Sequence, residues 1–256
     1  MSSFGDFIQF ILGIETAYAP GPCDEPLDCH VINCQNKNFE NKPIKKLLYF
    51  SIYYIVNDDA FKIAANTWRN DLNLSDSSTT DVCYISYDVK SEPQFKSAWT
   101  SIFTLANEGN YLVEKGSLFT HASDSIKNSG LEFKEIPDDP NADEYEKGEA
   151  TLRLDEMKQL EILPWSKSGQ LWLNGCNTAI ERYGWTPAQV FADRQKVKTY
   201  GQVGFAYFSE KKETYDRFDS WGNDPLYLRA YKRSDNVRQG EESTGKAIPE
   251  KEFNPR

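Results

Sequence analysis

The chain has 256 residues, enough for one large domain or two small ones with a sizeable buried core. Its 39 acidic and 29 basic residues give a net charge of −10, which argues against nucleic acid as a partner, because binding a polyanion needs a basic face. Hydrophobic residues make up 39% and aromatic residues 14%, which excludes wholesale disorder. No apolar run reaches about 18 residues, so we expect no integral membrane segment.

The two ends of the chain differ in character from its middle. The first 44 residues pair an amphipathic start with a Pro, Gly, Asn and Cys-rich stretch, which predicts a strap or cap over a main domain at 45–235. The charged residues 236–256 predict a flexible C-terminal tail. Asp6 and Glu15, and the lack of a basic region, do not fit a cleaved signal peptide. We therefore expect a cytoplasmic protein, or one exported without such a peptide.

Three of the five cysteines, Cys23, Cys29 and Cys34, crowd into the N-terminal segment beside His30. This grouping raises the possibility of a zinc site. However, the spacings of five and four intervening residues match no common zinc finger, so a disulfide or plain surface thiols are the better expectation. We predict no metal site and no cofactor.

Hydrophobic runs and turn residues predict strands alternating with helices from residue 45 onwards. The run LLYFSIYYIV at 47–56 is almost continuously apolar and β-branched, as expected of a strand buried on both faces of a parallel sheet. A short arm of a hairpin is predicted at 130–133. The further strands are predicted at 82–87, 116–120, 171–173, 201–208 and 226–231, and the helices after Asp58, around Pro93, at 152–163 and from Thr186.

This alternation predicts an α/β fold with a mainly parallel sheet and helices on both faces. An acidic loop at 137–149 is expected to be solvated, and a cleavage site or lid are possible roles for it. Asp58, Asp88, His121 and Cys176 each follow the carboxyl end of a predicted strand. Open α/β sheets bind their ligands beyond that edge, so the four residues define one candidate rim.

A thiol and an imidazole on one rim form a familiar catalytic pair. The thiol must become a thiolate to attack a carbonyl, and a nearby imidazole lowers the pKa of the thiol and later protonates the leaving group. Here His121 precedes Cys176 by 55 residues. Papain-like hydrolases have the opposite order, whereas caspases place the histidine about 50 residues upstream.

Two short motifs carry a family resemblance: Leu-Phe-Thr-His at 118–121 and Leu-Trp-Leu-Asn-Gly-Cys at 171–176. They resemble the caspase-like cysteine peptidases (caspases, metacaspases, gingipain and clostripain relatives). In that family one strand ends in a histidine, usually followed by Gly, and the next ends in a small residue followed by the nucleophilic Cys. The resemblance covers about residues 45–234 and implies a caspase-like three-layer sandwich.

By this resemblance, Cys176 is the nucleophile and His121 the general acid and base that cleave a protein or peptide substrate through a thioester. The backbone N–H groups of Cys176 and Ala122 would hold the oxyanion. The chain departs from the family at two places. Ala122 stands where the family has Gly, and Asn177-Thr178 replace the Arg-Gly that follows the cysteine of caspases proper, so their acidic specificity is not implied.

Three other rim residues are candidates for substrate binding. Asp58 and Asp88 have the charge to pair with a basic substrate side chain, although a helix cap is the simpler role for Asp58. Asn174 precedes the Gly-Cys pair and completes the set.

Three alternatives stay open. In the plainest one, Cys176 is a buried small apolar residue and His121 a hydrogen-bonded polar neighbour. In the second, the domain is a non-catalytic caspase-like binding module or effector, a role that the fold alone does not distinguish from an enzyme. In the third, Cys176 and Arg182 form the C-x5-R spacing of phosphatases, although no glycine lies between them and Glu181 would oppose a dianion. A bacterial effector or toxin is the setting suggested by analogy.

Overall fold

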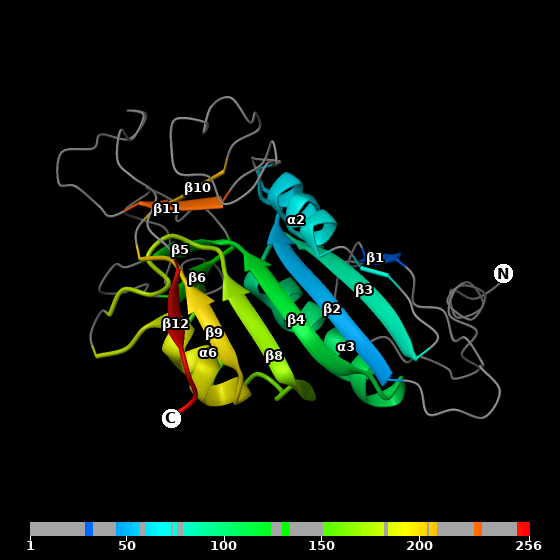
Figure 1. Ribbon diagram of the computed structural model, residues 1–256. Coiled ribbons are helices and arrows are strands. Elements are labelled where there is room, and N and C mark those ends of the chain that lie inside the picture. Colours follow the sequence, from blue (N-terminus) through cyan, green and yellow to red (C-terminus); the bar gives the residue numbers. More distant parts are fainter. Residues whose placement is uncertain are drawn as a thin grey trace, which may run out of the picture.

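A computed structural model gives the fold, shown as a ribbon in Figure 1. It describes residues 29–32, 45–56, 60–72, 74–75, 79–123, 130–133, 151–181, 184–203, 205–208, 228–231 and 250–256. Several sites of the sequence analysis lie outside these residues, so the predictions made for them stay predictions. They are Asp58, Arg182, Cys23, Cys34, the acidic loop at 137–149 and the side chains of residues 29–32.

The main sheet has seven strands in the order β1-β3-β2-β4-β8-β9-β12. The five inner strands are parallel, and β1 and β12 are antiparallel strands at its two edges. The bounds are β1 Cys29–Ile32, β2 Lys45–Tyr54, β3 Thr80–Val89, β4 Leu112–Phe119, β8 Trp165–Leu173, β9 Lys198–Gly201 and β12 Lys251–Phe253. The predicted α/β class and mainly parallel sheet are therefore confirmed.

Two small antiparallel sheets and four helices complete the described part of the chain. One small sheet has three strands and the other has two. Their bounds are β5 His121–Ser123, β6 Gly130–Glu132 and β7 Thr151–Leu152, and β10 Phe205–Phe208 and β11 Leu228–Tyr231. The helices are α2 Ala60–Asp71, α3 Glu92–Glu108, α5 Leu154–Met157 and α6 Pro187–Gln195.

Helices cover both faces of the sheet, as the sequence predicts. Phe50 of β2 packs against Trp99 of α3 with ring centroids 5.8 Å apart. The next residue, Ser51, points to the opposite face, where its hydroxyl bonds that of Tyr84 at 2.7 Å. The Tyr84 ring in turn meets Trp68 of α2. Helix α2 therefore lies on one face, and α3 lies on the other (Figure 1).

The strand order reverses direction at β2. The chain passes from β2 to β3 on one side, and then to β4, β8 and β9 on the other. In open α/β sheets, ligands bind beyond the carboxyl ends of the strands at such a reversal. The end of β4, where His121 follows, is one side of this switch point.

Side-chain caps fix where helices α3 and α6 begin. The Ser91 hydroxyl accepts the Gln94 N–H at the start of α3, and the Thr186 hydroxyl accepts the Gln189 N–H at 3.0 Å at the start of α6. A proline lies in the first turn of each helix, where its missing N–H costs nothing. The sequence signals at Pro93 and Thr186 are thereby confirmed.

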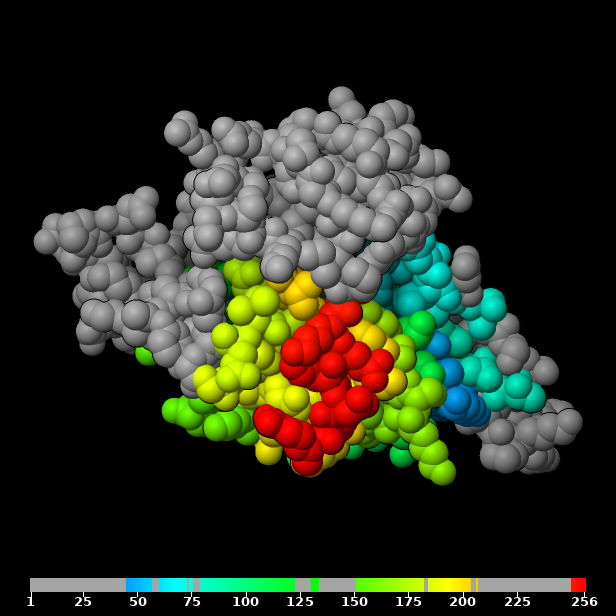
Figure 2. Space-filling view, turned by 60° about the vertical axis from the view of Figure 1, so that its left-hand side comes forward, coloured from blue at the N-terminus to red at the C-terminus, as the bar shows by residue number. Residues whose placement is uncertain are grey.

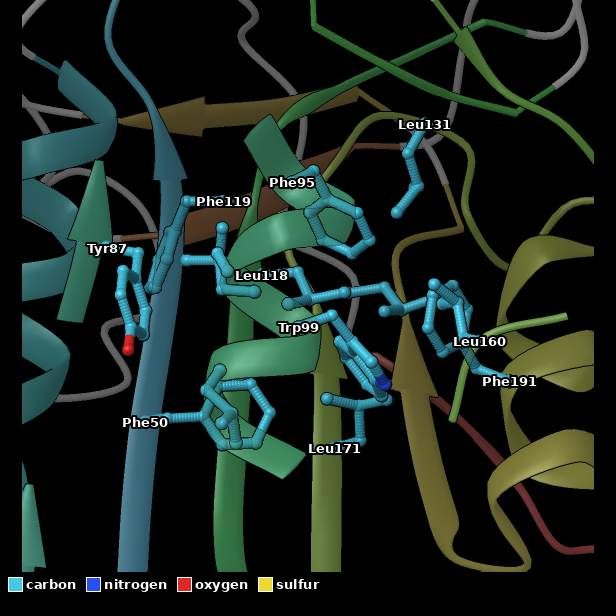
Figure 3. Close-up of a cluster of buried hydrophobic side chains, with 14 of the residues drawn as sticks. Phe50, Tyr87, Phe95, Trp99, Leu118, Phe119, Leu131, Leu160, Leu171 and Phe191 are labelled. Atoms are coloured by element: carbon cyan, nitrogen blue, oxygen red, sulfur yellow. The ribbon is translucent and has the colours of Figure 1, made fainter. Parts of the chain in front are cut away.

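Much of the buried hydrophobic core lies between the sheet and the layer formed by α3 and α6. Figure 3 shows Trp99 at its centre, with Phe50, Leu118 and Leu171 from the strands and Phe191 from α6 around it. The Trp99 ring is fully buried, and its Nε1 donates to the Glu161 carbonyl at 2.9 Å. This cluster fixes the strands that carry the candidate rim.

Two predicted elements are wrong in extent. The predicted helix at 152–163 is helical only at 154–157, because Thr151 and Leu152 pair with β6 and the backbone after residue 157 turns towards β8. Its apolar side chains, among them Leu160 and Leu163, are nevertheless buried in the core. The predicted strand at 201–208 is two strands, because the chain leaves the main sheet after Gly201 and pairs with β11 from Phe205.

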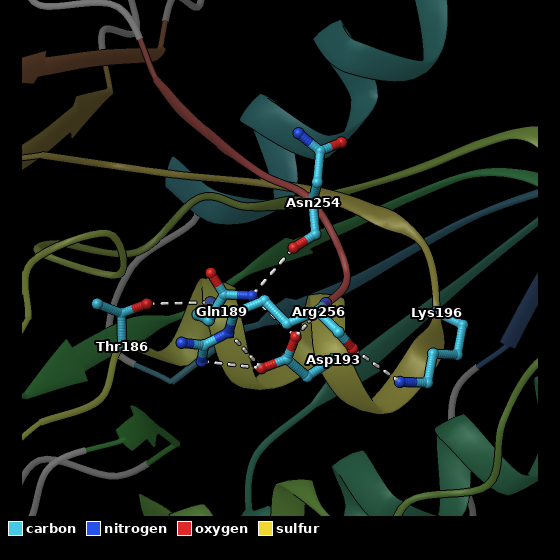
Figure 4. A network of polar contacts seen from close by, with 6 residues as sticks. All are labelled: Thr186, Gln189, Asp193, Lys196, Asn254 and Arg256. Carbon is cyan, nitrogen blue, oxygen red and sulfur yellow. Dashed lines mark hydrogen bonds and ion pairs between the residues drawn. The ribbon is translucent and has the colours of Figure 1, made fainter.

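The predicted flexible tail is wrong for residues 250–256. Strand β12 pairs with β9, and Figure 2 shows this segment (red) lying on the β9 and α6 surface. Arg256 binds Asp193 of α6 through its backbone N–H at 2.8 Å and its guanidinium at 2.9 Å, and Gln189 donates to the Asn254 carbonyl (Figure 4). Hydrogen bonding by Arg256 holds the pKa of the Asp193 carboxyl below its usual value. Residues 232–249 lie outside the described part.

Glu92 is a buried acid at the start of α3, only 4% exposed. Lys96 forms ion pairs with Glu92 and, at 2.7 Å, with Glu156. Burial raises the pKa of Glu92 from 4.5 to about 7, and the ion pair with Lys96 offsets only part of that rise. The folded protein thus favours the protonated Glu92, so its contribution to stability is greatest below pH 4.5 and is lost as the pH rises through 7.

We expect Glu92→Gln to remove this pH dependence. The free energy of unfolding of the variant, relative to wild type, should rise by up to about 3 kcal/mol between pH 4 and pH 8, since each pKa unit is worth about 1.4 kcal/mol. Urea denaturation at intervals across that range measures the difference. A wild-type to variant difference that is flat with pH would contradict the assignment to Glu92.

Candidate active site

The strands that precede His121 and Cys176 are parallel neighbours in the sheet. Leu118 of β4 lies opposite Leu173 of β8, and the Asn174 N–H extends this ladder by donating to the Leu118 carbonyl at 2.8 Å. The sequence-based expectation that these two strands are adjacent and run in the same direction is confirmed. Both candidate residues therefore leave the sheet from its carboxyl edge, one strand apart.

Gly175 brings the two segments into direct contact. A Cβ atom on this glycine would lie 2.9 Å from the Thr120 carbonyl oxygen and 3.2 Å from the Ala122 Cβ. Any larger residue would push against the backbone that carries His121, so the position requires glycine. The loop that presents Cys176 is thus packed against the residues on either side of His121.

Thr178 fixes the shape of the cysteine loop from inside. Its hydroxyl is fully buried, donates to the Leu173 carbonyl at 2.9 Å and accepts the Gln202 N–H at 2.9 Å. The Thr178 carbonyl accepts the Ala188 N–H at 3.0 Å, from the first turn of α6. The loop is therefore anchored to β8, β9 and α6 together, which places Cys176 on a rigid support.

Cys176 is reduced and partly exposed at the turn that follows β8. Its Sγ accepts the Ala206 N–H of β10 at 3.3 Å and lies 3.9 Å from the Ala206 carbonyl oxygen. The next residue, Asn177, has a left-handed backbone with φ of 59°. Asn is among the residues that tolerate this conformation, so the turn forms without a glycine after the cysteine.

His121 is exposed, and its imidazole is supported by two aromatic rings. The Phe61 ring of α2 lies 4.9 Å away and the Tyr54 ring at the end of β2 lies 5.7 Å away, both edge to face. Both rings belong to the β2–α2 segment, whereas His121 follows the neighbouring strand β4. They hold the imidazole at the rim while leaving it open to solvent.

Two further residues lie beside the pair and were not predicted from the sequence. Glu132 lies directly opposite His121 in the pairing of β5 with β6, on the same face of that small sheet. A carboxylate in that place suits the third group that orients a catalytic base. Ala206 is the second, and it reaches Cys176 through its backbone. No sequence signal reveals either, because both positions depend on pairing between distant segments.

The other predicted rim residues have different surroundings. Asn174 is 3% exposed, and its amide donates to the Ser117 hydroxyl at 2.6 Å, so it ties β8 to β4 and does not face a substrate. Asp88 is the penultimate residue of β3 and partly exposed. Ala122 pairs with Leu131 and is not among the residues with positive φ in the described part. Its backbone is thus ordinary where the resembled family has Gly.

Among the described side chains, no group of three or more His, Cys, Asp or Glu is close enough to hold a metal ion. No helix in the described part is long and apolar enough to cross a membrane. The rim instead combines the partly exposed Cys176, the exposed His121 just beyond the end of the adjacent strand, and the Ala206 N–H at the sulfur. A thiol and an imidazole are side chains that nucleophilic catalysis uses.

Comparison with known proteins finds no match: no family model fits the chain, and no curated protein or solved structure is significantly similar to it.

Proposed function

We propose that the chain is a cysteine peptidase or amide hydrolase with a caspase-like three-layer architecture, acting through a thioester. Cys176 attacks the carbonyl of a protein or peptide substrate, and the bond to the leaving amine breaks. His121 takes the thiol proton and later donates a proton to that amine. Water then hydrolyses the thioester, with His121 as the base.

One observation carries the proposal: the Gly175 backbone packs so closely on Thr120 and Ala122 that the thiol and the imidazole are held on touching segments. Cys176 and His121 follow adjacent parallel strands, and both are at least partly exposed. A cysteine that served only as a small buried apolar residue would not need this placement. The N–H groups of Cys176 and Ala122 are the proposed oxyanion donors.

Incubation with a diverse peptide library tests the proposal. Products that appear with the wild-type protein and disappear with Cys176→Ala would support it, and mass spectrometry should find a peptidyl electrophile attached to Cys176. If neither cleavage nor covalent labelling depends on Cys176, the chain is a caspase-like binding module or effector, the second candidate function.

The phosphatase alternative gains one supporting observation. Asn177 supplies the left-handed residue that an anion-binding turn of backbone N–H groups needs, so the lack of glycine does not exclude such a turn. Hydrolysis of para-nitrophenyl phosphate that is lost with Arg182→Ala would favour it over the peptidase. The carboxylate of Glu181 would oppose a dianion, so the phosphatase alternative ranks behind the peptidase proposal.

Of the two locations expected from the sequence, we favour export. Cys83 is disulfide-bonded and fully buried in β3. Disulfides persist in oxidising compartments and are rare in the cytosol. Intact-mass analysis of alkylated protein, with and without prior reduction, measures whether this bond is present in the protein as isolated from its source.

A further inference from the structure

We propose that strand β9 and helix α6 form a recognition site for an extended peptide, and that residues 250–256 fill this site as an internal ligand. A partner protein that supplies an extended segment with a phenylalanine and, three positions later, an arginine fits the same site. The inference does not depend on the proposed function, because Cys176 and His121 take no part in it. It follows from how β9 and α6 bind the main chain of residues 250–256 and two of its side chains.

Strand β9 binds the segment by strand addition. Lys251–Phe253 (β12) pairs antiparallel with β9, so that Lys251 lies opposite Gly201 and Phe253 opposite Thr199. Strand β12 is the edge of the main sheet and comes from a part of the chain far from β9 in sequence. Many peptide-binding domains take up an extended ligand in this way, with affinity from main-chain hydrogen bonds and specificity from alternate side chains. The pairing of β12 with β9 has the geometry of such a bound peptide.

Helix α6 continues this main-chain binding where the strand ends. The Gln189 amide donates to the Asn254 carbonyl at 3.1 Å, and the Asp193 carboxylate accepts the Arg256 N–H at 2.8 Å. The Lys196 ammonium donates to the main-chain oxygen of Arg256 at 3.4 Å. Residues 189, 193 and 196 share one face of the helix, and Figure 4 shows their side chains directed at the segment. Polar side chains that bind main-chain groups recognise the extended shape of a ligand whatever its sequence.

Two side chains of the segment are bound individually. Phe253 is 7% exposed and is part of the hydrophobic core. The Arg256 guanidinium donates to the Asp193 carboxylate at 2.9 Å and 3.2 Å, a charge-assisted contact. Gln189 also donates to that carboxylate, at 2.9 Å, so the acceptor is oriented from within α6. The site therefore selects an aromatic residue followed three positions later by arginine.

The contacts of this segment are few enough for a free peptide to compete with it. Of residues 250–256, only Phe253 is fully buried, and the Arg256 side chain is 74% exposed. An ion pair this exposed contributes little to binding. Attachment to the chain raises the local concentration of the segment, to about millimolar for a short flexible linker, and so compensates for a modest affinity. Weakening residues 250–256 should therefore open the site to a free peptide.

Binding of a free peptide to full-length variants tests the inference. The probe is a fluorescein-labelled peptide with the sequence of residues 250–256 and blocked ends, and fluorescence anisotropy measures its dissociation constant. Phe253→Ser weakens the internal ligand, so this variant should bind the probe at least about tenfold more tightly than wild type, as for loss of one buried aromatic side chain. Arg256→Ala should tighten binding about two- to fivefold, the usual effect of an exposed ion pair.

Asp193→Asn in the Phe253→Ser background shows whether the probe lies on α6. It should weaken binding about two- to fivefold, but should not affect a probe whose arginine is replaced by alanine. No binding to Phe253→Ser at about millimolar probe, in protein that keeps its circular dichroism spectrum, would overturn the proposal. Equal binding to wild type and both variants, or an equal effect of Asp193→Asn on the two probes, would also overturn it. Arg256→Ala keeps the test decisive if Phe253→Ser does not fold, because the Arg256 side chain is exposed.

Discussion

Replacement of His121 by alanine is expected to lower peptide hydrolysis by about 10²- to 10⁴-fold, the usual contribution of a general acid and base. Cys176→Ala should abolish thioester formation and lower the rate at least as far. If the two residues act as one unit, as we propose, the double variant should be little slower than Cys176→Ala alone. Steady-state kinetics on a cleaved library peptide measures all three values of kcat/KM.

The second histidine of the chain provides the matched control. His30→Ala changes the same residue type in β1, at the edge of the sheet away from β4, and should leave hydrolysis unchanged. Far-UV circular dichroism and thermal unfolding should show that His121→Ala keeps the fold, since its imidazole is exposed. Undiminished hydrolysis in His121→Ala would remove the imidazole from the mechanism.

The largest effect on stability is expected from Trp99→Ala. Trp99 is fully buried, and its ring lies within 5.9 Å of the rings of Phe50, Phe95 and Phe191. Truncation leaves a cavity at the centre of the core and removes the donor to the Glu161 carbonyl. Such changes cost about 3–5 kcal/mol. That is a large share of the roughly 5–15 kcal/mol that stabilises a typical domain.

Trp172→Ala is the control for this second prediction. Trp172 stacks on Tyr200 at 5.1 Å on the opposite face of the sheet and remains partly exposed. Its truncation should cost clearly less than that of Trp99, because solvent fills part of the space. Urea denaturation of both variants gives the comparison. A larger loss of unfolding free energy in Trp172→Ala than in Trp99→Ala would contradict the assignment of the main core to the α3 and α6 side of the sheet.

The sequence was sufficient to predict the parallel sheet because its inner strands are buried on both faces. A strand buried on both faces is apolar at nearly every position, as in the run at 47–56 and in the strand around Ile85. The edge strands carry none: β12 is Lys-Glu-Phe, with two exposed charged residues, and its pairing with β9 depends on α6 contacts far away in sequence. Apolar spacing also misled at 152–163, where Leu160 and Leu163 are buried from an irregular backbone.

The candidate site shows the same division. The placement of Cys176 and His121 beyond adjacent strand ends could be predicted because each follows a recognisable strand. Which side chains surround them could not, because Glu132 and Ala206 arrive through strand pairs that no local pattern encodes. Asn174 was predicted to bind substrate because the sequence places it at a strand end, but the sequence does not show where its side chain points. Its hydrogen bond to Ser117 across two strands decides that direction.

The central claim is that the imidazole of His121 controls the reactivity of the Cys176 thiol. The most direct measurement is the pH dependence of Cys176 alkylation in the wild-type protein and in His121→Ala. The account predicts a wild-type thiol pKa below the ordinary value of about 8.5, and a return towards that value, by about one unit or more, when the imidazole is removed. Superimposable pH profiles in the two proteins would contradict it.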